Sequence, residues 1–247
     1  MKTEFVSAEI DDHIAVATMR RPPVNAVNTQ LMEELLSVFD TLANDDDVRV
    51  IVLTGWKDIF SAGADLREGS GDGEDAAYLR RLRAASEAFF AILACRKPTI
   101  AAVNGPALGA GVVLVASCDI LIASDNAFLA LPEVGVGVIG GARHAMRLLG
   151  HSRTRRMMLT GHRVPAAELY RVGAIEKCVP RDQLMTEARA IAAEIADKDP
   201  AVTQLAKRAL NDVEGISLRD GYAHEQELLL DHLTSRRKGP GPGLERL

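Results

Sequence analysis

The chain has 247 residues, of which 47% are hydrophobic and 26% charged, and its formal net charge is −5 at pH 7. This length fits one large domain, or one domain with an appendage, and the apolar content is enough for a sizeable core. An acidic chain lacks the broad positive field that holds nucleic acid, so we expect no nucleic-acid partner. The basic run Arg153, Arg155 and Arg156 is predicted to be a solvated helix face.

The cysteines and the hydropathy of the chain indicate the cellular compartment in which the protein is expected. Cys95, Cys118 and Cys178 lie far apart in apolar stretches and lack metal-ligand spacing, so we expect buried free thiols and no metal site. Free thiols fit a reducing compartment, and a cytoplasmic location is expected. No apolar run approaches the roughly 20 residues that span a bilayer. The first residues include acids and form no apolar run, which argues against a signal peptide.

The first half of the chain alternates strand and helix patterns. A hairpin is predicted at the start, and RVIVL is an unbroken apolar run, typical of a strand buried on both faces. The expected strands are residues 4–10, 14–19 and 49–53, and the expected helices are residues 28–43 and 76–94. The polar, glycine-rich residues 67–75 between them are predicted to be poorly ordered without ligand.

The second half continues the alternation and ends in helices. Strands are expected at residues 99–103, 119–123, 127–131 and 174–179, and helices at residues 112–117, 142–149, 154–160 and 166–171. Residues 184–232 are almost entirely helical in pattern, and the Gly-Pro-rich tail after them is expected to be partly disordered. The sequence therefore predicts an α/β core over residues 1–190 and a C-terminal helical region over residues 191–247.

Gly135, Gly137 and Gly140 form a G-x-G-x-x-G pattern, which is typical of dinucleotide-binding turns. Such a turn also needs an acidic residue about 20 positions further on to hold the ribose. Residue 160 is a threonine, and residues 157–162 contain no carboxylate. A nicotinamide-dependent dehydrogenase is therefore disfavoured. A nicotinamide-dependent absorbance change on addition of NAD would support it after all.

Two turns rich in small residues follow buried strands. One is FSAGADL at residues 60–66, and the other is NGPALGAG at residues 104–111, which leads into a helix. Small residues let a ligand carbonyl come within hydrogen-bonding reach of main-chain N–H groups, and a helix start adds unpaired donors. Two such N–H groups converging on one oxygen would form an oxyanion hole. Either turn taken alone is better explained as a tight turn.

Glu133 stands between Pro132 and Val134, with Leu131 and Val136 close by in the sequence. Apolar surroundings would raise the pKa of its carboxyl toward neutrality, which suits a general acid or base. A turn carboxylate that faces water is an equally good interpretation of this stretch alone.

Taken together, FSAGADL, AAVNGPALGAG and LPEVGVG resemble the motifs of the enoyl-CoA hydratase/isomerase, or crotonase, family. The resemblance extends from RPPVNAV at residues 21–27 to LAKRAL at residues 205–210, and Glu133 follows Ala110 by 23 residues, as in the family. It implies a crotonase-like spiral of repeated β-β-α units with a helical C-terminal region. It also implies an acyl-CoA enzyme of fatty acid metabolism that assembles as a homotrimer or a dimer of trimers.

The resemblance also assigns roles to residues. The backbone N–H groups of Ala64 and Ala110 would bind the thioester oxygen, and Glu133 would be the acid/base. The implied acyl-CoA contacts are Val24, Ala62, Ala64, Asp65, Leu66, Arg67, Ala110 and Gly141. Arg20, Arg21 or Arg67 could reach the CoA phosphates, or could be solvated surface residues. Coenzyme A is part of the substrate in this family, so no separate cofactor is expected.

Val113 departs from the family pattern, because two-carboxylate hydratases carry their first glutamate at that position. A valine cannot activate water, so isomerisation or another non-hydratase reaction is favoured. The alternatives are hydration by Glu133 alone, ring opening or C–C cleavage by an acyl-CoA hydrolase, and a non-catalytic RNA-binding protein on the same fold. Arg143 or His144 could bind a carboxylate or ketone on the acyl group, although a helix-surface residue is the favoured interpretation of His144.

Overall fold

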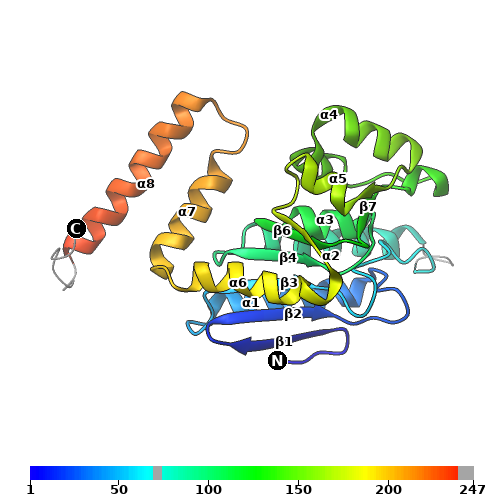
Figure 1. Cartoon of the computed structure of the whole chain (residues 1–247), viewed down its shortest axis with the longest axis horizontal. Coiled ribbons are helices and arrows are strands. Elements are labelled where there is room, and N and C mark those ends of the chain that lie inside the picture. The colour runs from blue at the N-terminus through cyan, green and yellow to red at the C-terminus, as the bar shows by residue number, and fades with distance from the viewer. Residues whose placement is uncertain (69–73, 239–247) are drawn as a thin grey trace. The chain divides into compact units, whose positions relative to one another are not determined.

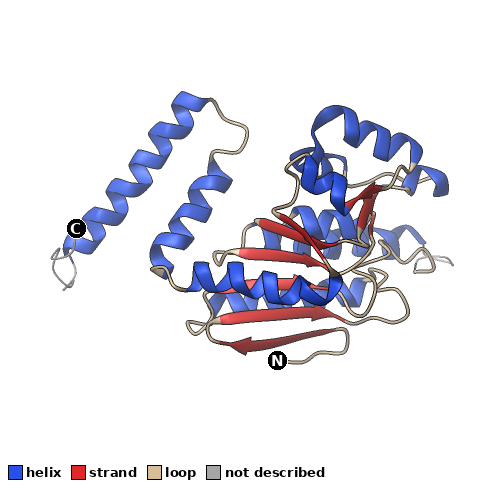
Figure 2. Cartoon of the chain, in the orientation of Figure 1, coloured by secondary structure: helices blue, strands red, loops and turns tan. Residues whose placement is uncertain are grey.

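The computed structural model describes residues 1–68 and 74–238 of the chain (Figure 1). It divides into two compact units, Met1–Lys198 and Asp199–Leu247. The first unit is an α/β domain with a mixed sheet, and the second is helical (Figure 2). The α/β class predicted from the sequence is therefore confirmed.

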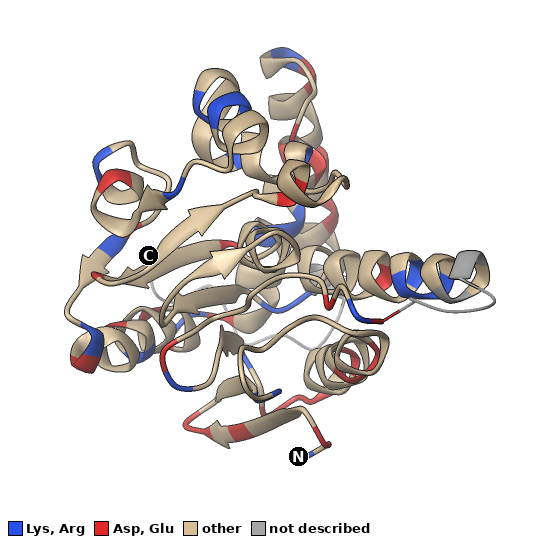
Figure 3. Cartoon of the chain, turned by 90° about the vertical axis from the view of Figure 1, so that its right-hand side faces the viewer, with Lys and Arg blue, Asp and Glu red and all other residues tan. Residues whose placement is uncertain are grey.

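The main sheet has the strand order β1-β2-β3-β4-β6-β9 in the described residues. Its strands are β1 (Val6–Asp11), β2 (Ile14–Met19), β3 (Val50–Thr54), β4 (Thr99–Val103), β6 (Ile120–Ser124) and β9 (Lys177–Val179). β1 is antiparallel to β2, and every later pair is parallel. The strands in the middle of the fold are almost free of charged residues (Figure 3), as expected for parallel strands covered on both faces.

Alternate residues of β3 pack on opposite faces of the sheet. Ile51 and Leu53 join the core cluster that includes the apolar face of α1 (Thr29–Asn44), whereas Val50 and Val52 join the cluster that includes α6 (Leu184–Ala196). This is the period of two expected for a strand. The predicted boundary at 190/191 falls inside α6, which the structure keeps whole within the first unit. The reason is that Ala188 and Ala192 lie in one buried stripe against the sheet.

A small second sheet holds the segments that lead into the candidate site. It pairs β5 (Ala107–Leu108) with β7 (Phe128–Ala130) in parallel, and β7 with β8 (Val164–Pro165) in antiparallel orientation. Neither β5 nor β8 was predicted, because a strand of two residues carries no periodicity. The remaining elements of this region are α3 (Ala110–Ala116), the 3₁₀ turn η1 (Glu133–Val136), α4 (Ala142–Thr160), α5 (Ala166–Arg171) and η2 (Arg181–Gln183).

Gly150 interrupts α4, because its φ of 65° and ψ of −170° are not helical. The two helices predicted for this region correspond to the two sides of that kink. Within the second of them, Arg155 and Arg156 are exposed, as predicted, whereas Arg153 is partly buried and pairs with Glu168 at 2.6 Å. None of the three cysteines, all within the described residues, forms a disulfide; Cys95 and Cys118 are buried and Cys178 is partly buried.

α2 (Glu74–Leu93) packs along α1 and follows the polar segment that was predicted to be poorly ordered. Of that segment, residues 69–73 lie outside the described residues, as does the tail from residue 239 onward. The predictions about order in these two stretches therefore stay predictions.

The second unit contains α7 (Pro200–Asp212) and α8 (Leu218–Lys238). Asp199 caps α7 by accepting a hydrogen bond from the N–H of Ala201 at 2.9 Å, and Pro200 occupies the first helical position, where its missing N–H costs nothing. Large apolar side chains on these helices are exposed, including Leu210, Leu218, Tyr222 and Leu230. No helix in the described part of the chain is long and apolar enough to cross a membrane.

Candidate active site

The two small-residue turns lie directly against each other. Ser61 and Ala107 form a parallel bridge, and the N–H of Leu108 donates to the carbonyl of Ser61 at 2.9 Å. Gly63 has a φ of 86°, and a Cβ built on it would lie 2.7 Å from the carbonyl oxygen of Leu108. A side chain at Gly63 would therefore push the turns apart, which explains a glycine at this position.

Hydrogen bonds on either side of Ala64 determine where its own N–H group points. Val27 donates to the carbonyl of Gly63 at 2.7 Å, and Asp65 donates to the carbonyl of Val27 at 2.8 Å. In a parallel bridge of this kind the intervening residue directs its N–H to the opposite side. Ala64 is exposed, and its N–H has no acceptor in the described part of the chain. That N–H is thus available to a ligand.

Ala110 supplies the second donor. It is the first residue of α3 and follows Gly109, whose φ of 51° and ψ of −116° belong to a region that side chains disfavour. The first N–H groups of a helix have no partner within the helix, and none is found for Ala110 among residues 1–68 and 74–238. Because Gly109 packs on Gly63, the structure brings the two predicted oxyanion donors to neighbouring turns.

Glu133 lies at the same place. A Cβ built on Gly109 would be 2.6 Å from Glu133 Oε1, so the carboxyl group covers the residue that precedes Ala110. Glu133 Oε2 is buried and has no hydrogen-bond partner among the described residues. Burial raises the pKa of this carboxyl above its ordinary value. The buried Oε2 disagrees with the interpretation of a turn carboxylate that faces water, and the acid/base role of Glu133 stays a prediction.

Val113 and Gly141 form an apolar wall in this region. A Cβ built on Gly141 would lie 3.0 Å from Val113 Cγ2 and 3.2 Å from a methyl carbon of Leu131. Val113 is buried, and neither Val113 nor Leu131 has a polar side-chain atom. The position that carries a second carboxylate in two-carboxylate hydratases is thus lined by hydrocarbon in this chain.

His144 lies one helical turn after Gly141, partly buried, with its ring centroid 6.2 Å from that of Phe89 on α2. It is therefore a residue of the α2–α4 interface rather than of an open helix surface. Arg143, its neighbour, is exposed. Their predicted contacts with an acyl group stay predictions.

The residues assigned to the CoA path fall into two groups. Val24, Leu66 and Arg67 are exposed, and Ala62 is half-buried, with its N–H donating to the carbonyl of Val24 at 3.0 Å. The Asp65 side chain, by contrast, is only 7% exposed. Its backbone remains beside Ala64, but its carboxylate is engaged within the protein.

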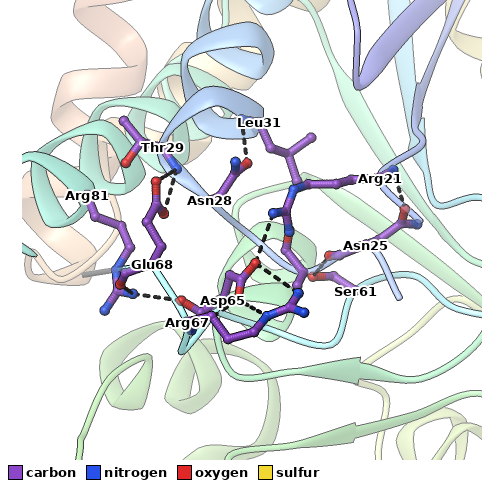
Figure 4. Close-up of polar contacts among 11 residues, drawn as sticks. Arg21, Asn25, Asn28, Thr29, Leu31, Ser61, Asp65, Arg67, Glu68 and Arg81 are labelled. Carbon is purple, nitrogen blue, oxygen red and sulfur yellow. Dashed lines mark hydrogen bonds and ion pairs between the residues drawn. The ribbon is translucent and has the colours of Figure 1, made fainter. Parts of the chain in front are cut away.

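Arg21 and Arg67 hold that carboxylate (Figure 4). Arg21 Nη2 donates to Asp65 Oδ2 at 2.9 Å, and Arg67 Nε donates to Asp65 Oδ1 at 3.2 Å. These bonds lower the pKa of Asp65 to about 2, with Arg67 the largest cause. Of the three arginines considered for the CoA phosphates, Arg21 is therefore committed to the protein, while Arg20 lies over the Trp56 ring at 4.7 Å.

The glycines of the G-x-G-x-x-G pattern are not closely packed, unlike Gly63 and Gly109 in the two small-residue turns. Gly135 lies within η1 and Gly137 ends it, so the pattern does not connect a strand to a helix. A Cβ built on Gly135, Gly137 or Gly140 would meet nothing within 4 Å. The dinucleotide interpretation therefore lacks its structural context. In residues 1–68 and 74–238, no three His, Cys, Asp or Glu side chains come together as metal ligands.

Sequence comparison agrees with this geometry. The family model described as enoyl-CoA hydratase/isomerase matches residues 9–246. The chain belongs to the enoyl-CoA hydratase/isomerase family. The resemblance drawn from the three motifs is thus confirmed over nearly the whole chain.

Relatives and solved structures within this family cover most of the chain. A probable enoyl-CoA hydratase, EchA8, of Mycobacterium tuberculosis is 38% identical, over 98% of this chain and 94% of its own length. A (7aS)-7a-methyl-1,5-dioxo-2,3,5,6,7,7a-hexahydro-1H-indene-carboxyl-CoA hydrolase of Rhodococcus jostii is 35% identical, over 87% of this chain and 83% of its own. The crystal structure of an enoyl-CoA hydratase from Bacillus anthracis superposes with a TM-score of 0.88 at 30% identity, over 95% of this chain and 93% of that one. The crotonase-like fold is therefore confirmed, and the chain is an acyl-CoA enzyme of this family.

Proposed function

We propose that the N–H groups of Ala64 and Ala110 form an oxyanion hole for an acyl-CoA thioester and that Glu133 is the acid/base. The observation that carries this proposal is the position of the Glu133 carboxyl group. Its Oε2 is buried with no hydrogen-bond partner among the described residues, and its Oε1 lies against Gly109, which immediately precedes Ala110. Burying a carboxyl oxygen without a hydrogen-bond partner costs free energy. A role in removing and returning a substrate proton would explain why the protein retains such an oxygen.

The chemistry follows from the thioester carbonyl. Two preorganised N–H groups stabilise the negative charge that develops on its oxygen when an α-proton is removed. Glu133 takes that proton from one carbon and returns it to another, which moves a double bond. We favour this isomerisation, or another single-acid reaction, over hydration, because Val113 offers no group that could hold or activate a water.

Three alternatives to isomerisation remain: two other reactions on a thioester and one binding function. Hydration with Glu133 alone is supported by the hydratase name of the mycobacterial relative, and ring opening or C–C cleavage is supported by the hydrolase name of the Rhodococcus relative. A non-catalytic RNA-binding protein on this fold is disfavoured by the net charge of −5.

We further propose that coenzyme A enters only as part of the substrate and that the enzyme acts in fatty acid metabolism in the cytoplasm.

A panel of acyl-CoA thioesters tests the reaction. It contains 3-enoyl, 2-enoyl and cyclic oxo-acyl thioesters, with products separated and weighed by mass spectrometry. We expect conversion of a 3-enoyl to a 2-enoyl thioester without change of mass. Gain of one water by a 2-enoyl thioester would indicate hydration, and gain of water by a cyclic oxo-acyl thioester would indicate hydrolytic ring opening. RNA binding without turnover of any thioester would replace the enzymatic proposal.

Val113→Glu is expected to raise hydration of a 2-enoyl-CoA above the parent, because it places a second carboxylate at the position where two-carboxylate hydratases carry their first glutamate. It should also lower the free energy of unfolding by about 3 kcal/mol, since Val113 is 5% exposed and an unpaired charge would be buried. The hydrated product is measured by mass and the stability by chemical denaturation. Val113→Gln, similar in size but uncharged, is the control. Folded Val113→Glu without added hydration would contradict this account of Val113.

We expect an oligomer, with a homotrimer or a dimer of trimers proposed as its form. The second unit exposes apolar side chains that a solvated monomer has no reason to retain, among them Leu218 at 91% and Leu210 at 71% exposure. Multi-angle light scattering at micromolar concentration measures the mass directly. A stable monomer would contradict this expectation.

A further inference from the structure

The orientation of the Ala64 N–H depends on how the residues on either side of it are held. On its amino-terminal side stands Gly63, whose N–H donates to Ser61 Oγ at 3.2 Å and whose φ is 86°. Glycine rotates about its backbone bonds more freely than any other residue. The carbonyl of Gly63, which lies in the same peptide as the Ala64 N–H, accepts from the N–H of Val27 at 2.7 Å. The other restraint on this donor is how firmly Asp65, the next residue, is held.

Asp65 is held at each of its polar groups. Its N–H donates to the carbonyl of Val27 at 2.8 Å, and its carboxylate accepts from Arg21 and Arg67. Its carbonyl oxygen accepts from Arg81 Nη1 at 2.8 Å. Arg81 lies on α2 and was not noticed in the sequence, because one arginine among several on a polar helix carries no motif.

The same nitrogen of Arg81 also donates to the carbonyl of Glu68 at 2.8 Å. It thereby joins both ends of the turn from Asp65 to Glu68, whose own N–H donates to the carbonyl of Asp65 at 3.2 Å. Glu68 in turn accepts from the N–H of Thr29, the first residue of α1, at 3.0 and 3.2 Å. Figure 4 shows Arg81, Glu68 and Thr29 joined in this way, beside the cluster of Arg21, Asp65 and Arg67.

The surroundings of Arg81 strengthen its hydrogen bonds to the carbonyls of Asp65 and Glu68. It is partly buried, and its guanidinium lies 5.0 Å from the centre of the Tyr78 ring one turn earlier on the same helix. A charged donor strengthens a hydrogen bond to a carbonyl, and partial burial weakens competition from water. The contact ties α2 to the peptide that follows Ala64.

We propose that Arg81 is a positioning residue for the oxyanion hole, holding the turn that orients the Ala64 N–H. This inference rests on the proposed function of Ala64. Without Arg81, the carbonyl of Asp65 keeps only the hydrogen bond from the Glu68 N–H at 3.2 Å, and the peptide between Ala64 and Asp65 gains freedom to rotate. The donor then points at the thioester oxygen for a smaller fraction of the time, which affects the transition state more than the bound substrate.

Arg81→Met tests the proposal, because methionine keeps an aliphatic stem against Tyr78 and removes the donors. Arg80→Met is the matched control, since Arg80 is the exposed neighbour on the same helix. The first measurement is hydrogen–deuterium exchange of the ligand-free proteins, followed in the peptide that contains residues 61–68. We expect the amides of Asp65 and Glu68 to exchange roughly tenfold faster in Arg81→Met, because local opening becomes easier. Arg80→Met should match the parent.

The second measurement is steady-state turnover of the substrate that the thioester panel identifies. We expect kcat of Arg81→Met to fall roughly 3- to 30-fold with KM within about twofold of the parent, a part of the loss that removal of an oxyanion donor causes. Unchanged exchange overturns the proposal, as does faster exchange with unchanged kcat. A rise in KM alone would mean that Arg81 binds substrate instead. If the parent turns over no thioester, the proposed function fails, and the exchange measurement still decides whether Arg81 holds the turn.

Discussion

Glu133→Gln is expected to lower turnover by roughly 10²–10⁴-fold, the usual effect of removing a general acid–base. Glutamine has nearly the same shape and cannot exchange the proton. Thioester affinity should change little, because the oxyanion donors belong to the backbone of Ala64 and Ala110. The measurements are kcat on the identified substrate and the dissociation constant of a non-reactive acyl-CoA.

The pH dependence provides a second check on Glu133. Burial raises the pKa of its carboxyl, so the base form is present above that raised pKa and is lost as the pH falls through it. The parent should therefore show an acidic limb in kcat/KM that Glu133→Gln lacks. Glu87→Gln, a change at an exposed glutamate of α2, is the control and should behave like the parent. Near-parent turnover of Glu133→Gln would make Glu133 structural.

Gly63→Ala is expected to lower kcat by roughly 10²–10³-fold, the loss that follows removal of one oxyanion donor. The new Cβ would lie 2.7 Å from the backbone oxygen of Leu108, and the φ of 86° is strained for alanine. Backbone cannot yield as a flexible side chain can, so the turns of Ala64 and Ala110 must separate. The unfolding free energy should also fall by about 1–3 kcal/mol, the typical cost of such strain.

Gly135→Ala is the control for this prediction. It makes the same chemical change at a glycine with an ordinary φ and open space around it. Parent-like turnover in both variants would show that the close approach of the two turns is not needed for the reaction. Loss of activity in both would mean that the loop after Glu133 matters more than the structure indicates.

Much of the fold could be predicted from periodicity alone. The apolar runs that became β3 and β4 are buried at every residue, and the stripe of Leu31, Leu35 and Phe39 became the buried face of α1. Both patterns follow from local geometry, which repeats every two residues in a strand and every 3.6 in a helix. β5 and β8 were missed, because strands of two residues exist only through pairing with distant segments.

The candidate site was predicted in part. The glycines at 63 and 109 and the glutamate between apolar neighbours are unusual enough to be recognised in the sequence, and the family resemblance links them. Asp65 was assigned to the CoA path largely through its backbone, and that contact stays a prediction, while the structure adds that its carboxylate pairs with Arg21 and Arg67. Arg81 went unnoticed, because its two carbonyl partners belong to a turn more than ten residues away in the chain.

The sequence by itself therefore determined the class of fold, the family and the identity of the chemical groups. These groups are two small-residue turns, one carboxylate, and a valine at the position where two-carboxylate hydratases carry their first glutamate. These follow from local residue patterns and from the order of motifs along the chain. Only the tertiary structure decided that Gly63 packs on Leu108 and that Arg81 donates to the carbonyl of Asp65. It also decided that Glu133 lies over Gly109, with one oxygen buried and without a hydrogen-bond partner in the described part of the chain. The physical reason is that burial, pKa and hydrogen-bond geometry depend on which distant segments meet, and no local pattern records those meetings.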